Sequence, residues 1–128
     1  MDTVQIALVD DHRLFRSGIT SLINNFNGYH VLFEAANGEE LITRISAKYK
    51  PDIILLDMNM PVMNGLECVK ALREAKLGPE MKVMMVTTEA DNSFIETALD
   101  NGADEFLMKP FTPESLREKM LLLGVIAA

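Results

Sequence analysis

The chain has 128 residues, of which 48% are hydrophobic, and its 12 basic and 19 acidic side chains give a formal net charge of −7. This length suits one domain, and the apolar fraction excludes a disordered chain. The acidic balance disfavours nucleic-acid binding, which needs a basic patch. No apolar run approaches the ~18 residues of a membrane span, no secretory leader is visible, and the one cysteine cannot form an internal disulfide. We therefore expect a single cytoplasmic domain over residues 1–128, with neither nucleic acid nor membrane as a partner.

The first half of the chain alternates apolar runs with amphipathic stretches. Residues 4–9 (VQIALV) predict a strand that stops at an acidic pair. Residues 14–26 carry apolar side chains at helical spacing until an Asn-Gly pair ends the pattern, and residues 29–34 predict a second strand. Asn37 followed by Glu40 is a capping-box pattern. It predicts that a second helix begins there.

The second half of the chain continues the alternation with three more strands and three more helices. The strands are expected at residues 52–57, 81–86 and 105–108. Apolar side chains at helical spacing mark the first two helices, at positions 66, 69 and 72 and then at 94, 95, 98 and 99. The last helix opens at Thr112 as N-cap, with Pro113 at the first helical position.

Strict alternation of strands and helices predicts the fold class. The strands are apolar without a period of two, which is typical of a parallel sheet covered on both faces. Parallel strands need crossover helices, and these crossovers are right-handed. The sequence therefore predicts an α/β fold in which five helices cover both faces of a five-stranded parallel sheet, a doubly wound arrangement.

Polar residues stand at the carboxyl ends of four of these strands. Asp10 and Asp11 follow the first strand, Asp57 ends the third, Thr87 follows the fourth and Lys109 follows the fifth. Ligands of open parallel sheets bind at this edge. If the loops converge, three carboxylates, a hydroxyl and an ammonium share one pocket.

This set of side chains favours phosphoryl chemistry with a metal ion. Three carboxylates repel one another unless a cation joins them, and one lysine cannot neutralise all three. Oxygen ligands favour a hard ion such as Mg²⁺. An aspartate can itself be the nucleophile towards a phosphoryl donor, while the metal and Lys109 stabilise the charge on the transferring group. Thr87 would then donate a hydrogen bond to a phosphoryl oxygen.

Four separated motifs resemble the receiver domain of two-component response regulators across nearly the whole chain. The first two motifs are the acidic pair with the residue before it (residues 9–11, VDD) and the segment around Asp57 (residues 55–65, LLDMNMPVMNG). The other two are the end of the fourth strand (residues 86–88, VTT) and the run that includes Lys109 (residues 102–111, GADEFLMKPF). The resemblance implies the flavodoxin-like, CheY-like fold with strand order 2-1-3-4-5.

The resemblance also implies roles for individual residues. Asp57 would accept a phosphoryl group from a histidine kinase or from a small donor such as acetyl phosphate. Asp11 would bind Mg²⁺ directly, Asp10 mainly through water, and the main-chain carbonyl of Asn59 would supply a further ligand. Lys109 would pair with the phosphoryl oxygens.

In this family, phosphorylation is coupled to a change in packing. The resemblance implies that Thr87 moves towards the phosphoryl group and vacates space for the ring of Phe106, which shifts the population between two conformations. Phe106 lacks the hydroxyl that a tyrosine has at this position in several chemotaxis relatives. The face formed by the fourth helix, the fifth strand and the fifth helix would then meet a target protein, an effector domain or a second copy of the chain.

The output of such a receiver has two alternatives in this sequence. The segment DHRLFRSG from Asp11 onward reads like receivers of NarL-type transcription factors, whereas the motifs around Asp57 and Lys109 read like single-domain chemotaxis regulators of the CheY type. The chain has no evident helix-turn-helix segment, so we expect no DNA-reading part in this chain alone. We expect a CheY-type stand-alone regulator, with a receiver excised from a NarL-type protein as the alternative.

Two other classes of protein share parts of this pattern. A haloacid-dehalogenase-type phosphatase also uses an aspartate nucleophile with Mg²⁺, but it needs a second aspartate where this chain has Asn59. A flavodoxin-like cofactor binder needs a phosphate loop after the first strand, where the acidic pair would repel an anion. We expect a phospho-accepting signalling module rather than an enzyme with a separate substrate.

Two further residues have simpler interpretations. His12 follows the acidic pair, but the chain offers no second histidine or cysteine at ligand spacing, which favours a polar residue of the first helical turn over a metal ligand. Cys68 lies on the apolar side of the third predicted helix, and we expect a small buried hydrophobic residue there.

Overall fold

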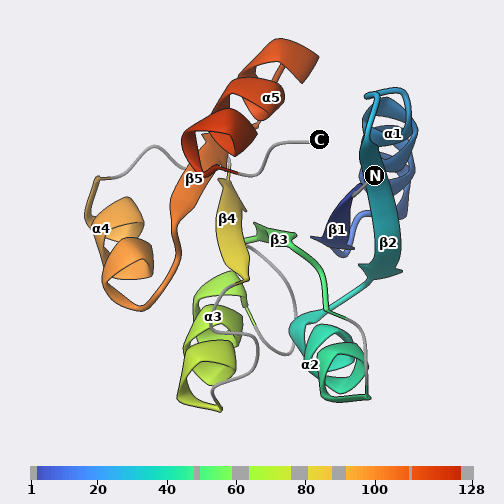
Figure 1. Cartoon of the computed structure of the whole chain (residues 1–128). Helices are drawn as coiled ribbons and strands as arrows, with labels where there is room; N and C mark the ends of the chain where they lie inside the picture. The colour runs from blue at the N-terminus through green and yellow to red at the C-terminus, as the bar shows by residue number, and fades with distance from the viewer. Residues whose placement is uncertain are drawn as a thin grey trace.

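The structure is a computed structural model that describes residues 3–47, 50–58, 64–75, 81–87, 92–109 and 111–124. In these ranges, strands and helices alternate along the chain (Figure 1). The strands are β1 (Val4–Val9), β2 (Tyr29–Ala35), β3 (Ile53–Asp57), β4 (Lys82–Thr87) and β5 (Glu105–Met108). The helices are α1 (Arg13–Asn24), α2 (Gly38–Ala47), α3 (Gly65–Glu74), α4 (Asn92–Asp100) and α5 (Pro113–Leu122). None of the described helices is long and apolar enough to cross a lipid bilayer.

The strands form one parallel sheet in the order β2-β1-β3-β4-β5. The predicted fold class and the strand order 2-1-3-4-5 are therefore confirmed. The register brings the strand ends to one edge, because Val9 pairs with Leu56, Asp57 with Val86, and Thr87 with Met108. The residues that follow these pairs consequently leave the sheet side by side.

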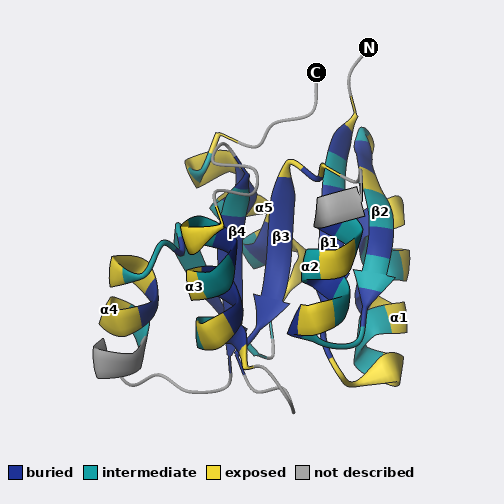
Figure 2. Cartoon of the chain, turned by 90° about the horizontal axis from the view of Figure 1, so that it is seen from below, coloured by how far each residue is buried: buried dark blue, intermediate teal, exposed yellow. Residues whose placement is uncertain are grey.

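Helices cover both faces of the sheet and enclose two apolar cores. In Figure 1, α1 and α5 lie on one side of the sheet, and α2 and α3 on the other. Buried residues of α1 and α5 pack with one set of strand side chains, and those of α2, α3 and α4 pack with the other set. Figure 2 shows β3 buried along its length and β4 buried beyond its first residue, while the helices expose their outer faces. Burial on both faces explains why the strand sequences lack polar alternation.

Hydrogen-bonded caps begin three of the helices. Asn37 Oδ1 accepts from the Glu40 amide at 2.9 Å, although the Glu40 carboxylate accepts from the Ala36 amide rather than from that of Asn37. Thr112 caps α5 by accepting from the Ser115 amide, with proline at the start of the helix as predicted. Asn64 caps α3, in a capping box with Glu67 that we had not predicted.

The first helix ends earlier than its apolar pattern predicts. Helix α1 stops at Asn24, and the Asn25 amide bonds back to Leu22 while Gly28 takes a φ of 89°. Phe26 therefore lies beyond the helix, where its ring meets Tyr29 edge-on with the ring centroids 5.9 Å apart. A side chain that packs on the core after a helix ends looks, in the sequence, like one more helical turn.

Candidate functional site

The predicted strand-end residues come together at the carboxyl edge of the sheet. Asp10, Asp57 and Thr87 are buried, with exposed fractions of 5%, 3% and 4%, whereas Asp11 is exposed. Two buried carboxylates that follow neighbouring strands are costly unless a cation compensates them. The burial of these polar groups marks this edge as the candidate site.

Lys109 supplies a positive charge between the two buried aspartates. Its Nζ lies 3.0 Å from Asp10 Oδ2, to which it donates a hydrogen bond, and 3.5 Å from Asp57 Oδ1. The lysine side chain is only 14% exposed, so the ammonium is poorly screened by water. Its main-chain amide donates to the Thr87 carbonyl at 2.8 Å. The predicted convergence of Asp10, Asp57, Thr87 and Lys109 is thus observed.

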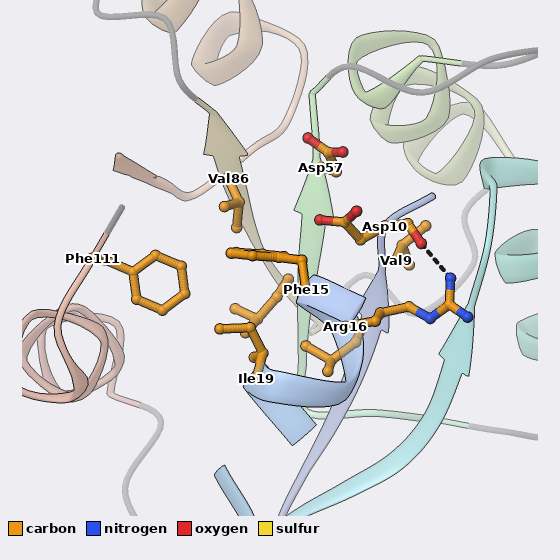
Figure 3. Close-up of a pocket in the computed structure, with 10 residues that line it drawn as sticks. Val9, Asp10, Phe15, Arg16, Ile19, Asp57, Val86 and Phe111 are labelled. Carbon is orange, nitrogen blue, oxygen red and sulfur yellow. Dashed lines mark hydrogen bonds between the residues drawn. The ribbon is translucent and has the colours of Figure 1, made fainter. Parts of the chain in front are cut away.

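Hydrogen bonds to its neighbours fix the acidic loop after β1. The His12 amide donates to Asp10 Oδ1 at 2.7 Å, and the Asp10 amide donates to the Ala35 carbonyl at 3.1 Å. Arg16 donates to the Asp10 carbonyl at 2.6 Å, drawn as the dashed line in Figure 3, and to Glu34 Oε1 at 3.0 Å. This brace between α1 and β2 was missed by sequence reasoning, because only the docking of α1 brings Arg16 under the loop.

The end of β3, which carries Asp57, lies in close contact with the start of α3. The Met58 amide donates to the Val86 carbonyl, and the Gly65 amide donates to the Met58 carbonyl, both at 3.0 Å. A Cβ at position 65 would lie 2.5 Å from the Asp57 carbonyl oxygen. Glycine at position 65 therefore lets the start of α3 pack against the end of β3.

Four side chains at this edge offer ligand atoms to a cation. One ligand atom from each of Asp10, Asp11, His12 and Asp57 lies within 4.8 Å of the other three. The donor set consists mainly of carboxylate oxygens, which suits a hard divalent cation such as Mg²⁺. Asn59, whose carbonyl was the other expected ligand, lies outside the described residues.

His12 lies closer to the carboxylates than its interpretation as an ordinary first-turn residue suggested. Its Nδ1 is 3.2 Å from Asp11 Oδ1 and 3.4 Å from Asp10 Oδ1. The imidazole side chain is nevertheless 71% exposed. His12 is the N-cap residue of α1, but its side chain makes no capping hydrogen bond. His12 therefore forms the solvent side of the acidic cluster.

A small pocket opens beside the carboxylates. It is lined mainly by apolar side chains of β1, β3, β4 and α1 together with Phe111, and its polar lining includes Asp10, Asp57 and Arg16 (Figure 3). Phe15 lies between Phe111 and the two carboxylates in this view. The pocket thus places the carboxylates of Asp10 and Asp57 next to an apolar wall.

The two proposed switch residues lie on neighbouring strands. Thr87 ends β4 and is buried, while Phe106 lies in β5 and is partly buried against the core that α2 and α3 cover. Lys119 Nζ lies 4.6 Å from the centroid of the Phe106 ring and 3.3 Å from Glu105 Oε1. The ring is therefore partly accessible, with a lysine of α5 over it.

Comparisons with known proteins assign the family. Residues 6–121 match the model of the response regulator receiver domain, and the chain belongs to this family. It is 42% identical to the nitrate/nitrite response regulator protein NarL of Escherichia coli over 111 residues, covering 87% of this chain and 50% of that protein. It is 34% identical to chemotaxis protein CheY1 of Helicobacter pylori over 122 residues, covering 94% of this chain and 98% of that protein.

A solved structure supports the same assignment. The chain superimposes on chemotaxis protein CheY4 of Vibrio cholerae with a TM-score of 0.85 and 32% identity, covering 94% of this chain and 98% of the other. The chain thus spans about half the length of NarL but nearly the whole of CheY1 and CheY4. Both the CheY-type and the NarL-type interpretation of this receiver are compatible with these relatives.

Family membership also gives the coarse function. The chain is a receiver domain of two-component signalling, a class that binds Mg²⁺ through acidic residues, takes phosphoryl groups from histidine kinases and acts on downstream targets. The acidic cluster at the sheet edge agrees with this chemistry. The family favours a receiver over the phosphatase and the flavodoxin-like cofactor binder considered above.

Proposed function

We propose that Asp57 is the phospho-acceptor of this receiver. The single observation that supports this most is the position of Lys109 Nζ, 3.0 Å from Asp10 and 3.5 Å from Asp57 in a region with little exposure to water. A carboxylate oxygen of Asp57 attacks the phosphorus, the bond from phosphorus to the donor's leaving group breaks, and its electron pair leaves with imidazole or acetate. Lys109 stabilises the charge on the phosphoryl oxygens.

In this proposal Asp10, Asp11 and Asp57, with the carbonyl of Asn59, would hold Mg²⁺. The ion, when bound, offsets the repulsion among the carboxylates and polarises the phosphoryl group. Asp11 is exposed and can reach the ion directly, whereas Asp10 is buried and already bonded to Lys109. This difference supports direct ligation by Asp11 and ligation through water by Asp10.

The proposed output is phosphorylation-dependent binding. Thr87 donates to a phosphoryl oxygen once Asp57 is modified, and Phe106 then moves inward on the neighbouring strand. The face formed by α4, β5 and α5 changes with it and meets a downstream target, an effector domain or a second copy of the chain. The chain therefore acts as a signalling module rather than as an enzyme with its own substrate.

We propose a single receiver domain over residues 1–128 that works in the cytoplasm as a CheY-type regulator. The coverage of nearly the whole of CheY1 supports this choice. The higher identity to NarL, over half of that protein's length, supports the alternative of a receiver taken from a DNA-binding regulator. In either case, this chain itself is expected to bind neither nucleic acid nor membrane.

Intact-mass analysis tests the phospho-acceptor. Acetyl phosphate with Mg²⁺ should add one phosphoryl group to the wild type and none to Asp57→Asn. Asp52→Asn is a matched control, because Asp52 immediately precedes β3 at its opposite end and bonds the Gln5 amide there. Equal labelling of the wild type and Asp57→Asn would remove Asp57 from this role.

Light scattering and affinity capture test the output. The protein with and without beryllofluoride, a stable mimic of the phosphoryl group, should differ either in molar mass or in the partner that it captures. A gain of mass favours the homodimer, and a gain of a separate protein favours the CheY-type target. If beryllofluoride binds and neither property changes, the proposed output is wrong.

A further inference from the structure

The ammonium of Lys109 has an aromatic neighbour as well as two carboxylates. Its Nζ lies 4.3 Å from the centroid of the Phe15 ring, well within the range of a cation–π interaction. Phe15 belongs to the first turn of α1, within the run of apolar side chains at helical spacing over residues 14–26. Figure 3 shows its ring between Phe111 and the carboxylates of Asp10 and Asp57.

Apolar packing, and not the lysine, holds the ring in this position. The centroid of Phe111 lies 6.1 Å from that of Phe15 with the planes at 89°, an edge-to-face contact. Phe15 packs against the core under α1 and α5, and it lines the pocket together with Ile19 and Val86. The ring face is therefore present at the site before any donor or cation arrives.

A neutral partner for Lys109 is useful because the charges at the site change during phosphorylation. The structure shows Lys109 bonded to Asp10, yet Asp10 is also among the proposed ligands of the cation. A cation held through water by Asp10 would compete for that carboxylate, so the lysine would lose part of this attraction. The ring attracts the ammonium through its quadrupole and adds no negative charge to a cluster that already holds three carboxylates.

We propose that Phe15 is a positioning residue for phosphoryl transfer, whose ring face keeps the Lys109 ammonium beside Asp57 while Asp10 engages the cation. This inference rests on the proposed function of Asp57. The ring makes and breaks no bond. The effect of Phe15 is to hold the positive charge where the phosphoryl oxygens will lie.

Graded fluorination of the ring tests the interaction without changing its shape. Phenylalanine at position 15 is replaced, by site-specific incorporation, with its 4-fluoro and 3,4,5-trifluoro analogues, which weaken the ring quadrupole stepwise. We expect the rate of phosphorylation by acetyl phosphate to fall in that order, by about fivefold for the trifluoro analogue, and the affinity for beryllofluoride to fall with it. The unfolding midpoint should show that both analogues stay folded under the assay conditions.

Phe26 provides the matched control, because Arg117 Cζ lies 5.9 Å from its ring in the same core but away from the carboxylates. Trifluorination at position 26 should leave the phosphorylation rate and the beryllofluoride affinity unchanged. An equal loss at positions 15 and 26, or no loss at position 15, would overturn the proposal.

A second measurement reads the position of the lysine directly. Protons near Nζ of Lys109 should show an upfield ring-current shift in the NMR spectrum of the wild type, which Phe26→Leu retains and Phe15→Leu loses. A shift that persists in Phe15→Leu would also refute the proposal. Failure of the proposed function is distinguishable, because wild type and Asp57→Asn would then label alike whatever the ring at position 15.

Discussion

The ammonium of Lys109 donates a 3.0 Å hydrogen bond to the carboxylate of Asp10, although 99 positions separate the two residues in the sequence. Asp10 follows β1 and Lys109 follows β5, so the bond joins loops from two strands that are not neighbours in the sheet. Only the complete sheet brings them together. The integrity of this ion pair is therefore linked to the fold, and charge changes at the site should alter stability.

Replacement of Lys109 by methionine should destabilise the protein when no metal is present. The variant leaves the buried carboxylates of Asp10 and Asp57 without their ammonium, and breaking a buried pair in this way is costly. We expect a loss of about 3 kcal/mol in the free energy of unfolding, measured with urea in the presence of a chelator. Lys119→Met is the control, because its pair with Glu105 is more exposed and should cost less than about 1 kcal/mol.

Asp57→Asn should have the opposite effect under the same conditions. The substitution removes one carboxylate from a cluster in which acidic groups outnumber the lysine, so the loss of repulsion outweighs the loss of one attraction at 3.5 Å. We expect the free energy of unfolding, measured with urea, to rise by about 1 kcal/mol in a chelator and by less in Mg²⁺. A variant less stable than the wild type without metal would contradict this account of the charges.

Asp11→Ala should weaken Mg²⁺ binding while the fold stays intact. Asp11 is exposed and among the candidate ligands, so its removal costs a cation ligand but little packing. We expect at least about a tenfold loss of affinity in a metal titration, with an unchanged unfolding midpoint in a chelator. Asp100→Ala, an exposed position at the end of α4, is the control and should bind Mg²⁺ as the wild type does. Equal affinities for Asp11→Ala and the wild type would exclude Asp11 as a ligand.

The sequence predicts which polar side chains meet at the sheet edge better than it predicts the residues that support them. The convergence of Asp57, Thr87 and Lys109 could be predicted because parallel strands end at one edge, so residues at equivalent places in separate strands must converge. Phe15 and Arg16 could not, since their contacts depend on the angle at which α1 docks on the sheet. A pattern of apolar spacing predicts that a helix face is buried, but not which buried side chain meets a charge.

Gly65→Ala should disturb the end of β3, where the proposed phospho-acceptor Asp57 lies. The added methyl group would lie 2.5 Å from the Asp57 carbonyl oxygen and 2.9 Å from Met58 Cα, both backbone atoms that cannot move aside cheaply. We expect a loss of about 2 kcal/mol in unfolding free energy, from urea titrations, and slower phosphorylation by acetyl phosphate. Gly18→Ala is the matched control, because nothing lies within 4 Å of its Cβ and alanine favours a helix. It should instead raise the free energy of unfolding by up to about 1 kcal/mol.

The buried thiol of Cys68 should make a contribution to the free energy of unfolding that is lost at alkaline pH. The thiol is fully buried in α3, as predicted, and burial raises its pKa from 9.0 to about 12. Because the folded state holds this proton more tightly, the contribution is complete below pH 9.0 and is lost as the pH rises towards about 12. The slope is at most about 1.4 kcal/mol per pH unit. Urea unfolding of the wild type and of Cys68→Ala is compared across this pH range. The two proteins have the same lysines and tyrosines, so the difference between their free energies of unfolding reports the thiol. Parallel curves for the two proteins would show that the thiol makes no such contribution.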